Sequence, residues 1–304
     1  MQYYLKKIRT TLKVFRLLLF TMATSFCSYA QEKNDDDLDV LLDDLFFNEQ
    51  QFLDELIDSG LSYNLMYTSI SYNNKTYFSG RDAGIDQFNV VPQISYYHSS
   101  SFNASISGIY YNEFDPKWDF TSLSLGYFNT IDKRKNIYYN LGYSKYFYSD
   151  GYDAFTNSID ASIGVRTSKR TFGTQLSASY LFGTDSSYQI ISSSYLNFIL
   201  TRKENFAIRC KPRLNFIIAK QSFAIERIVP INGQPTLETI NFEVFDLLNT
   251  QLNIPISLTT NSWDFELGYN INIPNAVATE TNLKTTNFFH FSVGYLFDLG
   301  RKLH

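Results

Sequence analysis

Residue types that build several other classes of protein are scarce in this chain. It has 2 Cys, 2 Trp and 3 His among its 304 residues, and 18% of its residues are charged, whereas soluble domains average about 25%. Two cysteines do not make a disulfide-stabilised scaffold, and three histidines leave few candidates for a histidine metal site. Lys and Arg number 26 against 30 Asp and Glu, so the chain lacks the basic excess of a general nucleic-acid binder. We therefore expect no nucleic-acid partner, no metal and no cofactor.

Long apolar runs and familiar catalytic motifs are also missing. After residue 60 no stretch reaches the 18 consecutive apolar residues of a transmembrane helix. The sequence has no G-x-S-x-G, H-E-x-x-H or C-x-x-C motif and no phosphate-binding glycine loop, so no catalytic residue is assigned. What it has in excess is Tyr (23) and Phe (27), which argues against a disordered chain. This composition favours an aromatic-rich β protein.

The first thirty residues have the pattern of a secretory signal peptide. Five cations and no acid precede residue 17, and a short apolar run covers 17–26. Ser28 and Ala30 place small residues where signal peptidase requires them, which predicts cleavage after Ala30. Removal of 1–30 leaves 21 cations and 30 acids, and Cys210 as the one remaining cysteine. A membrane anchor or a lipid attached at Cys27 is the alternative.

An acidic amphipathic segment follows at 31–60. Between Asp35 and Asp58 it has ten acids and no Lys or Arg. Apolar residues recur there at helical spacing, which predicts one or two short helices whose apolar stripe needs a partner. The stripe consists of Leu38, Leu41, Leu42, Leu45, Phe46, Phe52, Leu53 and Leu56.

From Leu61 onward polar and apolar residues alternate with a period of two, which is typical of β-strands. Between Trp263 and Ile273, for example, every second residue is apolar. Most of these segments are longer than the 5–6 residues common in soluble proteins, and each has the roughly 9–11 residues that a tilted strand needs to cross a bilayer. The alternation predicts twelve strands, at 61–70, 87–98, 101–114, 118–130, 136–149, 155–167, 170–183, 188–201, 204–219, 247–260, 262–273 and 286–299.

The lengths of the connections alternate as well. Links after even-numbered strands are short turns, whereas links after odd-numbered strands are longer or richer in turn residues; three are long loops, at 71–86, 220–246 and 274–285. An even number of strands with this asymmetry is the pattern of outer-membrane barrels and places both ends of the barrel on the periplasmic side. Aromatic residues near strand ends are candidates for the interfacial girdles: Phe102, Tyr127, Phe155, Phe172, Tyr180, Phe182, Phe206, Trp263 and Phe288.

These features together, with the aromatic-rich last strand at 289–297, resemble the outer-membrane β-barrel proteins of Gram-negative bacteria. Residues 300–304 extend past that strand, which departs from the terminal-aromatic pattern of such proteins. The resemblance covers 61–299. It implies an all-β fold, a transmembrane antiparallel up-and-down barrel at 61–304 in contact with outer-membrane lipid, preceded by the short helical segment.

Six charged residues have the phase of the barrel interior. Cations in the lipid layer cost roughly 2–4 kcal/mol each near the midplane, so the three alternate cations of the ninth strand are expected in the lumen, as are acids of matching phase. This lumen charge ladder consists of Arg209, Lys211, Arg213, Asp160, Asp264 and Glu266. It predicts either a charged constriction that selects solutes or an internal salt-bridge network that fills a narrow barrel.

Three functions follow from this interpretation. The first is a porin-like channel for small hydrophilic solutes, with lumen charges that set the preference. The second is a non-conducting barrel in an envelope complex. Segment 31–60 either plugs the lumen against the cations of the ladder, docks a periplasmic partner, or is a poorly ordered lead-in. The third is a lipid-modifying enzyme, for which His98 at a turn and the inward His290 beside Ser292 are poorly placed candidates.

Overall fold

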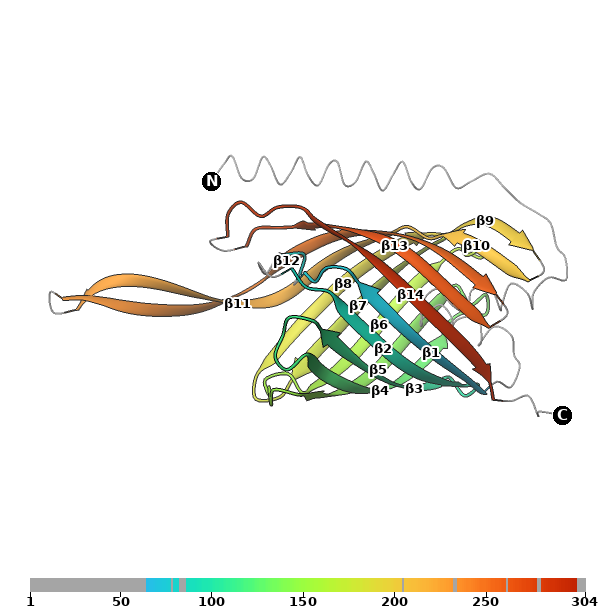
Figure 1. Ribbon diagram of the computed structural model, residues 1–304, viewed down its shortest axis with the longest axis horizontal. Helices are drawn as coiled ribbons and strands as arrows, with labels where there is room; N and C mark the ends of the chain where they lie inside the picture. The colour runs from blue at the N-terminus through green and yellow to red at the C-terminus, as the bar shows by residue number, and fades with distance from the viewer. Residues whose placement is uncertain are drawn as a thin grey trace. The chain divides into compact units, whose positions relative to one another are not determined.

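The computed structural model describes residues 64–77, 79–81, 86–203, 205–231, 234–260, 262–277 and 280–299 (Figure 1). The expected signal peptide at 1–30 and the acidic segment at 31–60, with its stripe from Leu38 to Leu56, lie outside these residues. The described part is all strand and loop. Its strands are β1 (Asn64–Asn73), β2 (Asn89–His98), β3 (Phe102–Tyr111), β4 (Trp118–Thr130), β5 (Ile137–Tyr148), β6 (Asn157–Arg166), β7 (Phe172–Phe182), β8 (Ser186–Leu196), β9 (Phe198–Lys203), β10 (Phe206–Cys210), β11 (Arg213–Ile231), β12 (Gln234–Thr260), β13 (Trp263–Pro274) and β14 (Thr286–Asp298).

The fourteen strands make twelve crossings of one closed barrel. The chain from β8 to β9 is interrupted at Asn197, and the chain from β10 to β11 at residues 211–212, so each pair is one crossing with an irregularity. Pro212 explains the second interruption because proline has no N–H for the strand ladder. The expectation of twelve antiparallel strands is confirmed, and β4 has the predicted bounds.

Closure joins the two ends of the barrel sequence. β1 pairs antiparallel with β14 from Leu65↔Asp298 to Asn73↔His290, and β8 joins β11 and β11 joins β12 on the opposite side. Every crossing therefore has a hydrogen-bonded neighbour on both sides. A closed sheet satisfies its backbone groups internally, which is the condition for a sheet in lipid.

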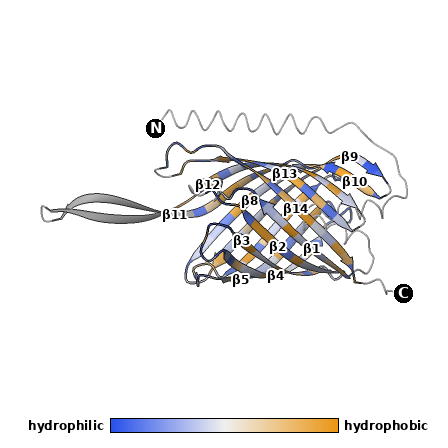
Figure 2. Ribbon diagram, in the orientation of Figure 1, coloured by the Kyte–Doolittle hydropathy of each residue, from blue (hydrophilic) through white to orange (hydrophobic). Residues whose placement is uncertain are grey.

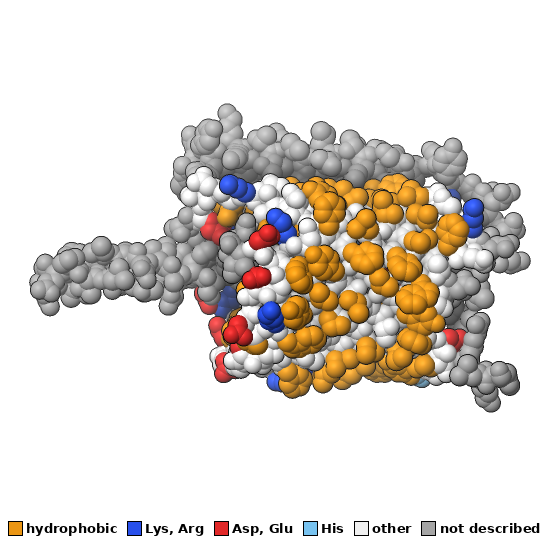
Figure 3. Space-filling view, viewed as in Figure 1, with side chains coloured by type: hydrophobic (Ala, Val, Ile, Leu, Met, Phe, Trp, Pro, Cys, Tyr) orange, Lys and Arg blue, Asp and Glu red, His pale blue; other side chains and the backbone are white. Residues whose placement is uncertain are grey.

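The two faces of the sheet carry different side chains. Outward residues are large and apolar, and they remain exposed even in mid-strand: Leu125 is 63% exposed and Leu267 is 56% exposed. Their chain neighbours Ser124 and Glu266 point inward. The strands in Figure 2 alternate along their length between polar and apolar residues, and the surface in Figure 3 shows an apolar band bordered by charged side chains at the loop end. The apolar face is thus the outside of this barrel.

Aromatic pairs lie along both edges of this band. At the short-turn edge, Phe102 packs edge-to-face on Tyr127 with centroids 5.0 Å apart, and Trp263 packs similarly on Tyr295 at 4.8 Å. At the loop edge, the centroids of Tyr188 and Phe245 lie 4.8 Å apart. Two of the expected girdle residues lie elsewhere. Phe288 is opposite Asn270 in the inward phase of β14, and Phe155 lies in the β5–β6 loop against Tyr152. Position near a strand end does not fix the phase of a side chain, which explains the error at Phe288, and β6 begins two residues after Phe155, which explains the other.

The connections follow the predicted asymmetry with one correction. The start of β1 and the end of β14 lie at the short-turn end, where the N–H of Leu299 donates to the carbonyl of Asn64 (2.8 Å). The loop expected at 220–246 is instead a two-stranded ribbon, paired as far as Ile231↔Gln234, that extends β11 and β12 past the other strands (Figure 1). Its sequence is rich in Ile, Val, Thr and Phe, residues that favour strands. Its two arms pair with each other through their backbones.

No helix of the described residues has the length and hydrophobicity needed to span a bilayer.

The outward apolar face makes a prediction for folding into membranes. Leu125→Arg should lower the free energy of unfolding in lipid vesicles by about 2–4 kcal/mol because it places a cation in the hydrocarbon layer. Ile131→Arg is the matched control: this residue is 61% exposed in the β4–β5 turn, where the same charge should cost about 0–1 kcal/mol. Urea titrations would measure both. Equal losses for the two variants would contradict the assignment of the faces.

Candidate functional site

The barrel interior is the candidate site, and its two walls differ. Strands β3 to β7 contribute a wall of small hydroxyl groups. Ser107 and Ser122 bond each other at 2.7 Å, and Ser124 and Ser144 at 2.8 Å. A cavity of about 290 Å³ lies against this wall. Its polar lining residues are Asn103, Ser105, Ser124, Asn140, Ser144, Asp160, Ser162, Ser177 and Ser179.

The opposite wall, from β10 to β14, carries most of the interior charge. Arg209 and Lys211 are 1% and 2% exposed and alternate with the outward residues Ile208 and Cys210. The Lys211 ammonium lies 4.1 Å from the centroid of the Tyr195 ring, close enough for a cation–π contact. Arg213 of β11 pairs with Tyr195 of β8, so both side chains point inward. All three cations of the predicted ladder therefore lie on the interior face.

Two predicted acids meet these cations on the same wall. In the pairing of neighbouring strands, Arg209 of β10 is opposite Ser257 of β12, and Ser257 is opposite Glu266 of β13. Glu266 also interacts electrostatically with Arg213.

The second acid, Asp264, accepts a hydrogen bond from the Thr259 hydroxyl (3.2 Å) and interacts electrostatically with Arg209. The sixth predicted residue, Asp160, lies on the serine wall and accepts from Ser158 (2.8 Å). The structure thus brings five of the six charges to one wall.

His290 belongs to a directed chain of hydrogen bonds on the charged wall. The Asn253 amide donates to Asn270 (2.8 Å), and Asn270 contacts Nδ1 of His290 at 3.1 Å. Because the amide nitrogen of Asn270 can only donate a hydrogen bond, Nδ1 of His290 is the acceptor and Nε2 carries the ring proton. Nε2 then donates to Oε1 of Glu266 at 2.6 Å. The histidine is therefore held by both ring nitrogens.

A second chain of polar contacts crosses five strands and reaches a loop. It runs from Ser193 to Asn215, then through Gln251 and Asn272 to Thr286, with donor–acceptor distances of 2.7–3.2 Å. The Thr286 hydroxyl finally donates to the carbonyl of Gly80 (2.9 Å). These amides were not among the predicted site residues, although Gln251 and Asn253, like Asn270 and Asn272, occupy alternate positions of the inward phase.

The β1–β2 loop folds against the interior wall at the loop end of the barrel. Gly80 has a φ of +79°, and a Cβ at this position would lie 2.5 Å from Oδ1 of the inward-facing Asn249. Only glycine tolerates both this backbone conformation and this approach. Gly80 therefore lies directly against the interior wall beside β12 and β14.

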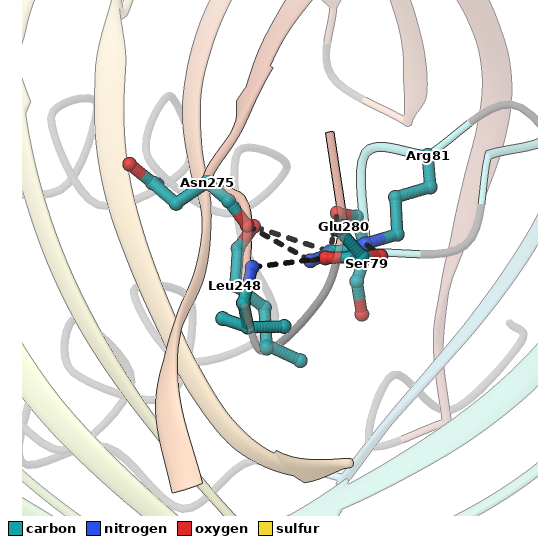
Figure 4. Close-up of polar contacts among 6 residues, drawn as sticks. Ser79, Arg81, Leu248, Asn275 and Glu280 are labelled. Carbon is teal, nitrogen blue, oxygen red and sulfur yellow. Dashed lines mark hydrogen bonds and ion pairs between the residues drawn. The ribbon is translucent and has the colours of Figure 1, made fainter. Parts of the chain in front are cut away.

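Arg81 fixes this loop to the β13–β14 loop (Figure 4). Its Nε and a terminal nitrogen each lie 2.7 Å from one carboxylate oxygen of Glu280. The guanidinium also donates to the carbonyls of Ser79 (3.1 Å), Leu248 (3.2 Å) and Asn275 (2.9 Å). Glu280 in turn accepts from the N–H of Val277 (3.1 Å). We call this bidentate pair with its carbonyl contacts the Arg81 clamp.

Taken together, these observations define the molecule: a closed antiparallel sheet, an apolar exterior band with aromatic edges, and a polar, charged interior. Soluble sandwiches bury their apolar face, whereas barrels of the outer-membrane type expose it to lipid. The chain is a transmembrane β-barrel. Its architecture assigns it to the outer membrane, where barrels of this construction occur.

No family model and no curated protein matches the chain. Among solved structures it is similar to the KdgM porin (9% identity, 76% of this chain and 98% of that chain, TM-score 0.45). It is similar to the NanC porin (10%, 76% and 98%, TM-score 0.43) and to LpxR from Salmonella typhimurium (10%, 76% and 100%, TM-score 0.41).

The Arg81 clamp should respond to acid. The hydrogen bonds from Arg81 lower the pKa of Glu280 and outweigh the desolvation that opposes them. The clamp's contribution is therefore complete above the ordinary pKa of a glutamate and is lost as the pH falls through the lowered pKa.

Glu280→Gln should mimic that loss at neutral pH and increase the rate of tryptic cleavage after Arg81 about tenfold or more, since charge-assisted bonds contribute about 1.5–3 kcal/mol. Glu243→Gln, which removes the exposed pair with Lys220, is the control and should leave that rate unchanged. Mass spectrometry of the fragments would measure both. Unchanged cleavage in Glu280→Gln would show that the clamp does not hold the loop.

Proposed function

We propose that this barrel is a channel for small hydrophilic solutes and that its charged wall sets their preference. The observation that carries the proposal is the separation of two interior linings, with interacting charges on one wall and serines around a cavity on the other. Hydroxyl and amide groups lining a passage replace part of the hydration shell of a polar solute, while fixed charges select its sign.

The charged wall favours anionic solutes. Arg209, Lys211 and Arg213 face two acids on that wall, Asp264 and Glu266, so the cations are in excess there. Both acids already interact with the arginines. The Lys211 ammonium lies over an aromatic ring, which preserves its charge while it is out of bulk water.

The loop end limits the size of the solute. Gly80 and Arg81 hold the β1–β2 loop against the wall, and a twelve-stranded barrel is narrower than the 16–18-stranded porins that contain an open aqueous channel. The clamp therefore makes the mouth a point of control, with small solutes as the expected cargo.

A non-conducting barrel in an envelope complex is the second candidate. The density of the interior networks favours it, because Asn253, Asn270, His290 and Glu266 occupy each other's hydrogen-bonding groups. In that case segment 31–60 would be the docking element for a periplasmic partner.

A lipid-modifying enzyme has less support. His98 contacts the Ser100 hydroxyl at 2.6 Å, but within a tight turn in which the N–H of Ser101 also donates to the His98 carbonyl (3.0 Å). The other candidate, His290, faces the lumen rather than the lipid.

Single-channel recording in planar bilayers tests the channel and its selectivity. Replacing Arg209, Lys211 and Arg213 by Gln should shift the reversal potential under a salt gradient towards cation selectivity, because the remaining wall charge is negative. Lys145→Gln is the matched control, since Lys145 is opposite the outward-facing Leu123 and should leave the potential unchanged. An unchanged potential in the triple variant would remove these residues from the pathway.

The absence of current decides between the two candidates. Folded protein that conducts neither as the full chain nor after deletion of 31–58 would contradict the channel and favour the non-conducting barrel.

A further inference from the structure

The two ends of the barrel carry opposite charge. At the loop end, the described side chains include ten acids, Asp86, Glu113, Asp115, Asp119, Asp150, Asp153, Asp185, Glu243, Asp246 and Glu280, against five cations, Lys75, Arg81, Lys117, Lys220 and Lys284. Among the described side chains that are not buried, the balance at the short-turn end is reversed, with seven cations and two acids, Asp132 and Asp298. We call these seven cations the basic rim: Lys133, Arg134, Lys135, Lys169, Arg170, Arg202 and Lys203.

Several side chains of the basic rim are exposed at the surface. Lys133, Arg134, Lys169 and Lys203 are exposed on three neighbouring connections. Asp132 offsets one of these charges; its carboxylate accepts from the N–H groups of Arg134 (3.2 Å) and Ile137 (2.7 Å) and shapes the β4–β5 turn. Like charges grouped on one rim repel one another, so a bound polyanion would stabilise the arrangement.

The chain carries such a polyanion directly before the barrel. Residues 38–58 include seven acids and no Lys or Arg. Five residues, 59–63, connect them to Asn64, and β1 begins at the short-turn end. Five residues span at most about 18 Å, so the linker tethers the acidic segment to the end of the barrel where the basic rim lies.

We propose that the basic rim is the docking surface for residues 38–58 of the same chain. The charges are complementary, and the short connection gives the segment an effective concentration in the millimolar range, which a free anionic partner does not reach. The rim also offers apolar contacts for the segment's stripe: Ile131 in the β4–β5 turn is 61% exposed and Leu200 near the β9–β10 turn is 56% exposed. This assignment does not depend on conduction, and it places the segment on the rim rather than in the lumen.

Protection of the segment from proteolysis tests the docking. Purified full chain in zwitterionic detergent is treated with a Glu-specific protease, and cleavage after Glu49 and Glu55 is followed by mass spectrometry. Replacing Lys133, Lys169 and Lys203 by Glu should speed this cleavage about tenfold at low salt. The unsubstituted chain should show the same acceleration in about 0.5 M salt, which screens the attraction.

Two matched variants separate docking from general effects. Reversing three cations of the loop end, Lys75, Lys117 and Lys284, should leave cleavage unchanged. Replacing Asp39, Asp43 and Asp44 by Asn on an unaltered barrel should accelerate it as the rim variant does, which keeps the test valid even if the rim variant fails to fold. Heat-dependent migration on gels reports folding.

Other occupants of the rim would give different results. Protection that requires vesicles with anionic lipid would identify lipid headgroups as the ligand of the rim. Cleavage at equal rates in the unsubstituted chain and the Asn variant would show that the segment does not dock on the rim. Either result would overturn the proposal.

Discussion

The structure depends on one constraint, that a sheet surrounded by hydrocarbon must satisfy every backbone N–H and C=O within itself. The pairing of β1 with β14 and of β8 and β12 with β11 removes the open edges. Once the sheet is closed, the two-residue period of a strand divides all side chains into an outer and an inner set. The apolar exterior and the polar interior follow from that division.

Inside the closed sheet, the two walls differ in side-chain size and in charge. Small serines leave space beside β3 to β7, whereas the wall from β10 to β14 must hold charges away from bulk water. Burial of an ion is costly unless it is paired or hydrogen-bonded. The acids beside Arg209 and Arg213, the Tyr195 ring under Lys211 and the chain through His290 meet that requirement.

Much of this arrangement is predictable from the sequence, because period-two alternation is a local property. It indicated the twelve crossings and assigned Arg209, Asp264 and Glu266 the phase in which the structure places them. The Arg81 clamp was not predictable, since its two residues are 199 positions apart and loops have no period. The β11–β12 ribbon was mistaken for a loop because an even alternation of short and long connections suggested one there.

The division of side chains between lipid and lumen is the central claim, and spin-label accessibility along β13 tests it most directly. Single cysteines from Trp263 to Pro274, in a Cys210→Ser background, are labelled in barrels reconstituted into bilayers, and collision with oxygen is measured at each position. The account predicts high oxygen accessibility at Phe265, Leu267, Tyr269 and Ile271 and low accessibility at the residues between them. A uniform profile, or the reverse phase, would contradict it.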